Sequence, residues 1–247
     1  MLACRVRPCQ GRTLLTREKR STTLFLGMPA KNRIKTYIEN GYYHIYNRGV
    51  EKRIIYVDTQ DYIVFLGLLK FYLSPLFNLP HPLAKNGVDF NFRIKKTFHE
   101  EVDLLAFCLM PNHFHLLVHQ KNKNSITEFM RAASTSYTMY FNKKYERVGS
   151  LFQGNYKASL VLDDNYLLYL SKYIHLNPQH LFAGSDPVEY PYSSYQYYIG
   201  SKKAVWVKPS FVLELLSDKR LRRIPLYKDF MDLKDNLKIL PKELIID

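Results

Sequence analysis

The chain has 247 residues, 47% of them hydrophobic, which is enough to bury the core of one domain with an extension. Its 36 lysines and arginines against 22 acidic residues give a formal charge of +14, which favours nucleic acid over an acidic protein or a membrane surface as partner. Three scattered cysteines argue against a disulfide framework, and the most apolar stretch, residues 62–77, is interrupted by lysine and proline, which argues against a membrane span.

The first 27 residues form a basic leader with six arginines and lysines and one acidic residue. No sustained hydrophobic periodicity accompanies these charges, so we expect residues 1–36 to be disordered, as a DNA-contacting arm or a targeting segment would be. Met28 opens the stretch MPAKNRIK, which is typical of the start of a soluble protein, so translation from Met28 is an equal alternative.

The next segments predict a strand, a helix and two further strands. Aromatic and β-branched residues over 42–50 indicate a strand that ends in a turn at Asn47–Gly49. Asp58 can cap a helix over residues 58–73, and after a proline-containing loop residues 90–94 can form a short strand. Two apolar runs, 102–110 and 113–120, flank Pro111-Asn112, which indicates an antiparallel pair or a bent strand.

The second half continues with alternating helices and a strand. Ser125 and Glu128 have the spacing of a capping box at the start of a helix over residues 125–145. Residues 156–162 suit a strand, and Asp163 or Asp164 can cap a third helix over residues 165–177, ended by Pro178. This order is typical of an α+β protein with helices packed on an antiparallel sheet. Residues beyond 190 suggest a small helical extension with a basic cluster at 219–223.

His113 and His115 are two positions apart in a predicted strand. Successive side chains of a strand point to opposite faces, so both imidazoles project to one side while Phe114 projects to the other. Two ring nitrogens can therefore converge on one ion. A His-x-His pair by itself is more often two ordinary histidines, and the chain shows no zinc-type spacing of further cysteines and histidines.

Tyr173 and Asn177 are four positions apart on the third predicted helix, so a phenol and an amide share one face. Any one of the 20 tyrosines is more often a packing residue, and Tyr137 and Tyr140 are rival nucleophiles without a metal-binding partner at a useful spacing. His175 points away from the Tyr173 face. What favours chemistry here is the combination with two histidines, a basic chain and the absence of a GxxxxGK phosphate loop.

Several sequence blocks occur in one order over residues 42–198, namely YYHIYNRGVEKR, FCLMPNHFHLLV, YERVGSLFQGNYK, YLSKYIHLNP and YPYSSYQYY. In these blocks the chain resembles the HUH single-tyrosine transposases of insertion sequences, in particular the REP-associated tyrosine transposases. The resemblance implies a ferredoxin-like α+β fold, an antiparallel sheet with helices packed on one face, in residues 37–182. Residues 183–247 would form the mainly helical C-terminal extension.

The resemblance also implies roles for individual residues. His113 and His115 would bind a divalent metal ion, Asn177 would complete the metal site, and Tyr173 would be the nucleophile. Two imidazoles and an amide oxygen leave coordination positions open, which suits Mg²⁺ or Mn²⁺. The implied reaction is metal-dependent cleavage and rejoining of single-stranded DNA at hairpin-flanked sites through a 5′-phosphotyrosine intermediate.

The predicted partner is single-stranded or hairpin DNA, and we expect Arg48, Lys52, Lys157 and Lys172 to contact its phosphates. No membrane partner is expected, and the protein would be a monomer or a homodimer. It would be a prokaryotic cytoplasmic protein, associated with the nucleoid while bound to DNA. The alternative is a non-cleaving protein of the same fold that binds DNA or RNA hairpins, and a replication initiator or relaxase would share the chemistry with a different substrate.

Overall fold

The computed structural model describes residues 37–75, 96–180, 186–217 and 226–233. The predicted leader, the strand expected at 90–94 and the basic cluster at 219–223 lie outside these residues. In chain order the described elements are β1 (Gly41–Arg48), η1 (Val50–Lys52), α1 (Thr59–Tyr72), β2 (Val102–Met110), β3 (His113–Gln120), α2 (Ser125–Lys144), β4 (Lys157–Val161), α3 (Asp164–Leu176), η3 (Asn177–His180), η4 (Pro187–Glu189), α4 (Tyr195–Tyr198), α5 (Ser210–Ser217) and α6 (Tyr227–Asp232).

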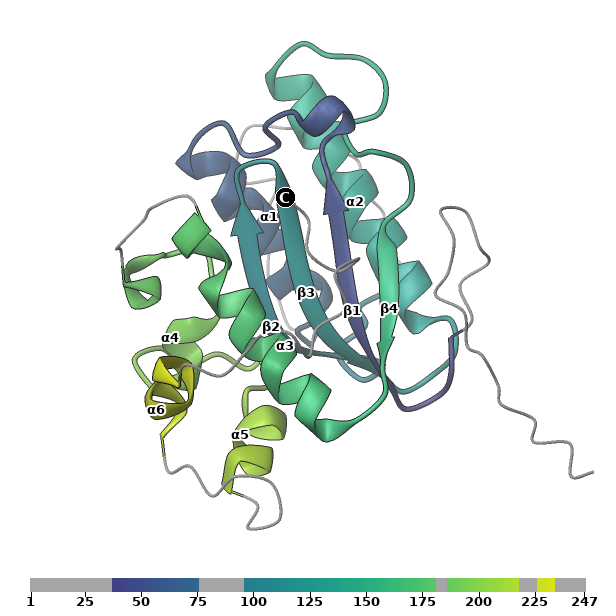
Figure 1. Ribbon diagram of the computed structural model, residues 1–247. Helices are drawn as coiled ribbons and strands as arrows, with labels where there is room; N and C mark the ends of the chain where they lie inside the picture. The colour runs from purple at the N-terminus through teal and green to yellow at the C-terminus, as the bar shows by residue number, and fades with distance from the viewer. Residues whose placement is uncertain (1–36, 76–95, 181–185, 218–225, 234–247) are drawn as a thin grey trace, which may run out of the picture. The chain divides into compact units, whose positions relative to one another are not determined.

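The four described strands form one sheet in the order β2-β3-β1-β4, and each neighbouring pair is antiparallel (Figure 1). β2 and β3 are joined by the turn at Pro111-Asn112, so the two apolar runs are an antiparallel pair rather than one bent strand. The predicted α+β fold with an antiparallel sheet is confirmed.

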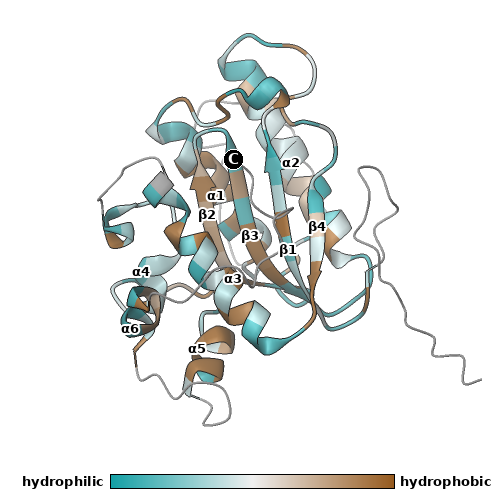
Figure 2. Ribbon diagram, viewed as in Figure 1, coloured by the Kyte–Doolittle hydropathy of each residue, from teal (hydrophilic) through white to brown (hydrophobic). Residues whose placement is uncertain are grey.

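Helices cover both faces of the sheet, because alternate residues of each strand point to opposite sides. Tyr43 and Phe114 belong to a core that is shared with α1 and α2. Tyr46 and Leu117 belong to a second core that is shared with α3 and the C-terminal helices. The expectation of helices on one face therefore holds for α1 and α2 only, and α3 lies on the other face (Figure 1). Figure 2 shows β2 as largely hydrophobic, whereas β1 and β4 carry hydrophilic stretches.

Two predicted helix caps are confirmed. Asp58 accepts a hydrogen bond from the backbone nitrogen of Asp61 at 3.1 Å, and Asp61 returns the contact in a capping box at the start of α1. Asp163 accepts from the backbone nitrogen of Tyr166 at 2.8 Å at the start of α3. Both caps satisfy donors that the first helical turn leaves without partners.

The capping box predicted at Ser125 and Glu128 is wrong. Asn124 is the cap residue of α2 and its side chain makes no capping hydrogen bond, while Ser125 is the first helical residue. The hydroxyl of Ser125 donates instead to the carboxylate of Glu101 at 2.9 Å. Because Ser125 already lies inside the helix, its side chain is not at the cap position, and its hydroxyl donates to a charged acceptor in the tertiary structure.

The predicted helical extension is present as α4, α5 and α6. Two isolated bridges, Cys108 to Ser193 and Leu104 to Val207, join it to β2. Residues 36–247 form one compact unit, which includes both the sheet and the extension. The expected domain boundary at 182/183 stays a proposal. None of the helices in the described ranges is long and apolar enough to span a bilayer.

Candidate active site

Four side chains predicted from the sequence meet between β3 and the C-terminal end of α3. The Nε2 atom of His113 lies 3.3 Å from Oδ1 of Asn177, although 64 positions separate the two residues. The ring of Tyr173 meets the ring of His115 edge-on, with centroids 5.5 Å apart. All four side chains are at most 8% exposed. The structure thus assembles the phenol, the amide and both imidazoles within one chain.

Local backbone geometry explains how each pair shares a direction. His113 and His115 alternate with Phe114 along β3, and Phe114 is buried in the core on the opposite face of the sheet. Asn177 follows the last residue of α3 but keeps helical backbone angles (φ −52°, ψ −39°). Its amide therefore lies one helical turn beyond Tyr173, on the same face.

Both histidine rings are held through their Nδ1 atoms. Oδ1 of Asn112 lies 2.6 Å from Nδ1 of His113, and the Asn112 amide nitrogen donates to the carbonyl oxygen of Lys52 at 3.3 Å. Because the amide nitrogen is used in that way, the oxygen accepts the Nδ1 proton of His113. Nε2 of His44 lies 2.8 Å from Nδ1 of His115. Each ring therefore has its Nδ1 engaged, which leaves Nε2 for the site.

The arrangement of acceptor atoms fits a divalent cation. Nε2 of His115 is buried and has no hydrogen-bond partner within the described chain. Nε2 of His113, which carries a lone pair in the tautomer set by Asn112, faces the Asn177 oxygen, and two such acceptors repel unless a proton or cation lies between them. Across the described ranges no three histidine, cysteine or carboxylate residues are grouped to hold an ion, so the Asn177 amide would be the third protein ligand.

Burial keeps the imidazoles of His44 and His115 neutral. It lowers the pKa of His44 from 6.5 to about 3. Burial also lowers the pKa of His115 well below its usual value, and the neighbouring His44 and His113 add to the shift. Neutral rings at physiological pH are the form that can ligate a metal ion.

Three of the four predicted phosphate contacts border this end of the sheet. Arg48 pairs with His113 across β1 and β3 and is half-buried. Lys157 is exposed, pairs with Tyr46 across β1 and β4, and holds its ammonium 5.5 Å from the centre of the Tyr46 ring. Lys52 is exposed in η1, and its backbone carbonyl oxygen accepts from the Asn112 amide nitrogen. Their role as phosphate contacts remains a proposal.

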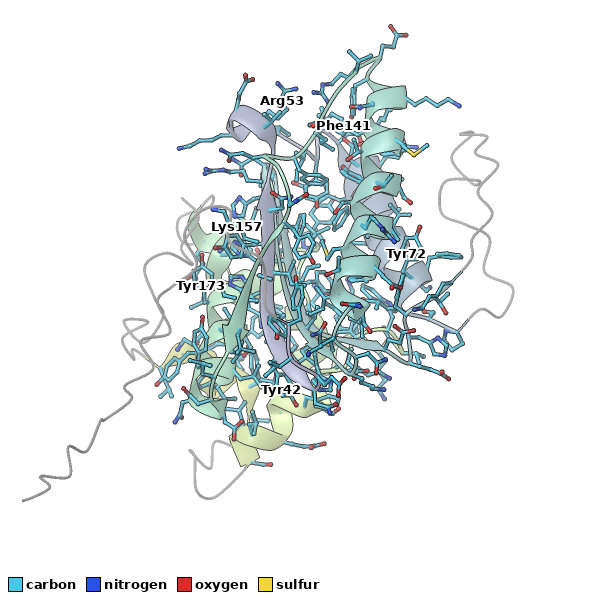
Figure 3. The ribbon with its side chains drawn as sticks, turned by 90° about the vertical axis from the view of Figure 1, so that its right-hand side faces the viewer. Tyr42, Arg53, Tyr72, Phe141, Lys157 and Tyr173 are labelled. Atoms are coloured by element: carbon cyan, nitrogen blue, oxygen red, sulfur yellow. The ribbon has the colours of Figure 1, made fainter. Side chains whose placement is uncertain are left out.

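The loop after β1 lies against the β2–β3 turn. The backbone nitrogen of Gly49 donates to the carbonyl oxygen of Asn112 at 2.8 Å. A Cβ on Gly49 would lie 2.3 Å from the carbonyl oxygen of Arg53, so only glycine fits this close approach. Figure 3 shows Arg53 of this loop at one end of the sheet and Tyr42 at the other, with Lys157 between them.

Lys172 does not face the site. It is 2% exposed, and its ammonium donates to the carbonyl oxygens of Phe230 at 2.8 Å and Leu233 at 2.6 Å, at the end of α6. Neighbouring helix positions differ by about 100°, so Lys172 points toward α6 while Tyr173 points toward the sheet. The prediction that Lys172 contacts DNA is therefore wrong; its charge instead satisfies the carbonyls at the C-terminus of α6.

Other polar side chains of α3 also bind the C-terminal extension. Nδ1 of His175 lies 2.8 Å from the Tyr227 hydroxyl, and its Nε2 lies 2.7 Å from the Ser194 hydroxyl. The Ser171 hydroxyl lies 2.9 Å from the same Tyr227 hydroxyl. The expectation that His175 points away from the nucleophile is confirmed. The helix that carries Tyr173 is thus fixed on one side by the sheet and on the other by the extension.

Sequence reasoning missed His44 and Asn112, the two residues that hold the ligand rings. They lie in the motifs YYHIYNRG and PNHFH, and Asn112 directly precedes the predicted ligand His113. The alternation of β1 places His44 on the same face as Tyr46, but only the pairing of β1 with β3 shows that this face meets His115.

Comparison of sequences identifies one matching family. Residues 92–177 match the model of the family described as IS200-like transposases, and this stretch contains His113, His115, Tyr173 and Asn177. No curated protein matches the chain. The match confirms the resemblance that the sequence motifs indicated.

Solved structures with a similar fold include the REP-associated tyrosine transposase bound to a REP hairpin, with a TM-score of 0.50 and 11% identity over 72% of this chain and 92% of that chain. A candidate transposase from Deinococcus radiodurans has a TM-score of 0.33 and 15% identity over 56% of this chain and 91% of that one. The tRNA(His) guanylyltransferase of Saccharomyces cerevisiae has a TM-score of 0.30 and 10% identity over 76% and 81%. The first match shows a shared fold, and the other two are too distant to support any argument.

Proposed function

We propose that this chain, which carries an IS200-like transposase domain over residues 92–177, cleaves and rejoins single-stranded DNA beside hairpins with Tyr173 as the nucleophile. The observation that carries the proposal is the meeting of Tyr173 with His115, and of Asn177 with His113, in one buried site. The formal charge of +14 favours a nucleic-acid partner. A hairpin bound to the relative of the same fold supports a hairpin substrate.

The reaction exchanges one phosphate ester for another. The phenolic oxygen of Tyr173 attacks the scissile phosphorus and gives up its proton; the bond to the 3′ oxygen breaks, and that oxygen takes up a proton. The product is a 5′-phosphotyrosine and a free 3′-hydroxyl. In the return step a 3′-hydroxyl attacks the same phosphorus and the phenolate leaves, which is favourable because a phenol with a pKa near ~10 is a better leaving group than an alkyl alcohol. No nucleoside triphosphate is consumed.

His113, His115 and Asn177 are the residues that would hold Mg²⁺ or Mn²⁺, which supplies Lewis-acid polarisation of the scissile phosphate when bound. The protein itself orients the two imidazoles through Asn112 and His44. It also holds the phenol beside them by fixing α3 between the sheet and the extension. Such positioning is a large part of the rate enhancement in phosphoryl-transfer sites.

Three basic side chains would hold the DNA backbone at this end of the sheet, namely Arg48, Lys52 and Lys157. The scissile phosphate must enter between β3 and α3, which a flexible single strand does more readily than a duplex. Because one chain supplies the nucleophile and all three proposed ligands, a monomer is sufficient for the reaction, and a homodimer would bring two complete sites.

Covalent capture tests the nucleophile. A pool of hairpin oligonucleotides with randomised single-stranded flanks, labelled at the 3′ end, is incubated with the protein and Mn²⁺ and separated on a denaturing gel. Wild type is expected to carry the label, because the 5′-phosphotyrosine retains the 3′ fragment. Tyr173→Phe is expected to lose the adduct and keep hairpin binding. Tyr169→Phe, one turn earlier and packed against Phe230, is the matched control that keeps the adduct.

Each result of this experiment has a defined meaning. An adduct formed by Tyr173→Phe assigns the nucleophile to another residue. A wild-type chain that binds hairpins and captures none of the pool favours the alternative, a non-cleaving hairpin-binding protein. His113→Ala and His115→Ala are each expected to abolish capture, and full capture by either variant removes that histidine from the mechanism.

A further inference from the structure

His44 is a buried histidine at the centre of the sheet that no sequence motif assigned to the site. It lies in β1 on the face that is covered by α3 and is 0% exposed. Its Nε2 is 2.8 Å from Nδ1 of His115, and the two rings are stacked with centroids 5.0 Å apart. Its ring also lies edge-on to Tyr173, with centroids 6.3 Å apart. His44 therefore touches both a proposed metal ligand and the proposed nucleophile.

The position of one proton decides which nitrogen of His115 can bind a cation. A neutral imidazole has one N–H and one lone pair. If the proton of His115 is on Nδ1, it donates to Nε2 of His44, and Nε2 of His115 presents a lone pair to the site. If His44 donates instead, Nδ1 of His115 must accept, its Nε2 carries the proton, and a cation is excluded. The tautomer of His115 is thus coupled to the direction of its hydrogen bond with His44.

The burial of His44 is difficult to explain by stability alone. Its Nδ1 atom is buried and has no hydrogen-bond partner in the part of the chain that the structure describes. A buried polar atom without a partner destabilises the fold, and a phenylalanine or leucine at this position would avoid that cost. The one described hydrogen bond of the ring is the one to His115. The cost is consistent with a function for that bond.

We propose that His44 is a positioning residue that accepts the Nδ1 proton of His115, holds the ring beside Tyr173 and keeps Nε2 of His115 available to the divalent ion. This inference rests on the proposed function. His44 would orient His115 through its Nδ1 atom, as Asn112 orients His113. Each proposed ligand ring would then be held by a hydrogen bond on the side away from the metal ion. Outer partners of this kind typically change metal affinity by about 10- to 100-fold when they are removed.

The experiment measures Mn²⁺ binding to the full chain by calorimetry, without DNA. His44→Phe preserves an aromatic ring and is expected to weaken Mn²⁺ binding by about 10- to 100-fold. His44→Gln, whose amide oxygen can accept the Nδ1 proton, is expected to recover most of the affinity. His119→Phe is the control, because His119 lies on the same face of β3 but pairs with Asp103 at the other end, so its loss is expected to leave Mn²⁺ affinity unchanged.

A second measurement needs no variant. In the metal-free wild-type chain, ¹⁵N NMR of the imidazole rings is expected to show His115 protonated at Nδ1. Protonation at Nε2, or equal Mn²⁺ affinity of wild type and His44→Phe, overturns the positioning role. Failure of the proposed function gives a different result. A chain that binds Mn²⁺ in a His44-dependent manner but never captures DNA supports the positioning role of His44 and refutes the role of Tyr173 as nucleophile.

Discussion

Replacing Lys172 by methionine separates two accounts of a residue that directly precedes the proposed nucleophile. If Lys172 contacted a DNA phosphate, its replacement would weaken DNA binding and leave the stability of the fold unchanged. The structure instead buries the ammonium against the C-terminal end of α6, where it donates to the carbonyls of Phe230 and Leu233 and lies 5.2 Å from the Phe230 ring. Lys172→Met keeps the apolar stem and removes only the charged donor.

The size of the effect follows from these contacts. A hydrogen bond to a charged group contributes about 1.5–3 kcal/mol, and two are lost. The carbonyls are left without this donor, while the cost of burying the ammonium disappears and offsets part of the loss. We therefore expect the free energy of unfolding to fall by about 3 kcal/mol. For a folded unit of this size this lowers the melting temperature by roughly 6–12 °C.

The assay combines thermal unfolding with hairpin binding at several salt concentrations. Lys157→Met is the matched control, since Lys157 is exposed beside Tyr46. It is expected to keep its melting temperature and to lower the slope of log affinity against log salt by about 0.7, the value for one single-strand phosphate contact. If Lys172→Met unfolds like wild type and Lys172 rather than Lys157 sets the salt slope, the reasoning from burial is refuted.

Three further predictions concern the scaffold of the site. Burial lowers the pKa of His175 to about 3, so below pH 6.5 the unfolded chain takes up a proton that the folded chain does not. Urea denaturation between pH 7 and 5 should therefore show the free energy of unfolding falling by about 1 kcal/mol per pH unit for this residue. A flat profile would contradict the burial of His175. Gly49→Ala should destabilise the fold by about 1–3 kcal/mol, because its Cβ meets the Arg53 carbonyl, and unchanged urea unfolding would show that the loop yields. Asp61→Ala removes the 0% exposed carboxylate that accepts from the Lys144 ammonium at 2.8 Å. Calorimetry should show that the free energy of unfolding falls by about 3–5 kcal/mol, and an unchanged value would show that the ion pair is dispensable.

Local sequence signals predicted those parts of the fold that depend on neighbouring residues. The caps at Asp58 and Asp163 were correct because each bonds a backbone nitrogen three positions away. The cap predicted at Ser125 is wrong because Asn124 is the cap residue and Ser125 lies in the first turn, where its hydroxyl donates to Glu101, 24 positions earlier. The second case needs the tertiary fold, since no local pattern shows which distant carboxylate lies beside the helix start.

The candidate site divides in the same way. Alternation along a strand put both imidazoles of His113 and His115 on one face, and the helical repeat put Tyr173 and Asn177 on one face, so each pair was determined by the sequence. That the two pairs face each other depends on the docking of α3 on the sheet. It is this docking that brings Asn177 within 3.3 Å of His113.

The sequence by itself determined a basic chain, its sequence of strands and helices, and the two local pairs of reactive side chains, because backbone periodicity acts over a few residues. Only the tertiary structure decided that Lys172 supports α6 rather than DNA and that His44 stands behind His115. The contact between Lys172 and Phe230 joins residues that are 58 positions apart, and the contact between His44 and His115 joins residues that are 71 positions apart. They exist only once strand register and helix docking are set, and the hydrophobic cores on the two faces of the sheet set both.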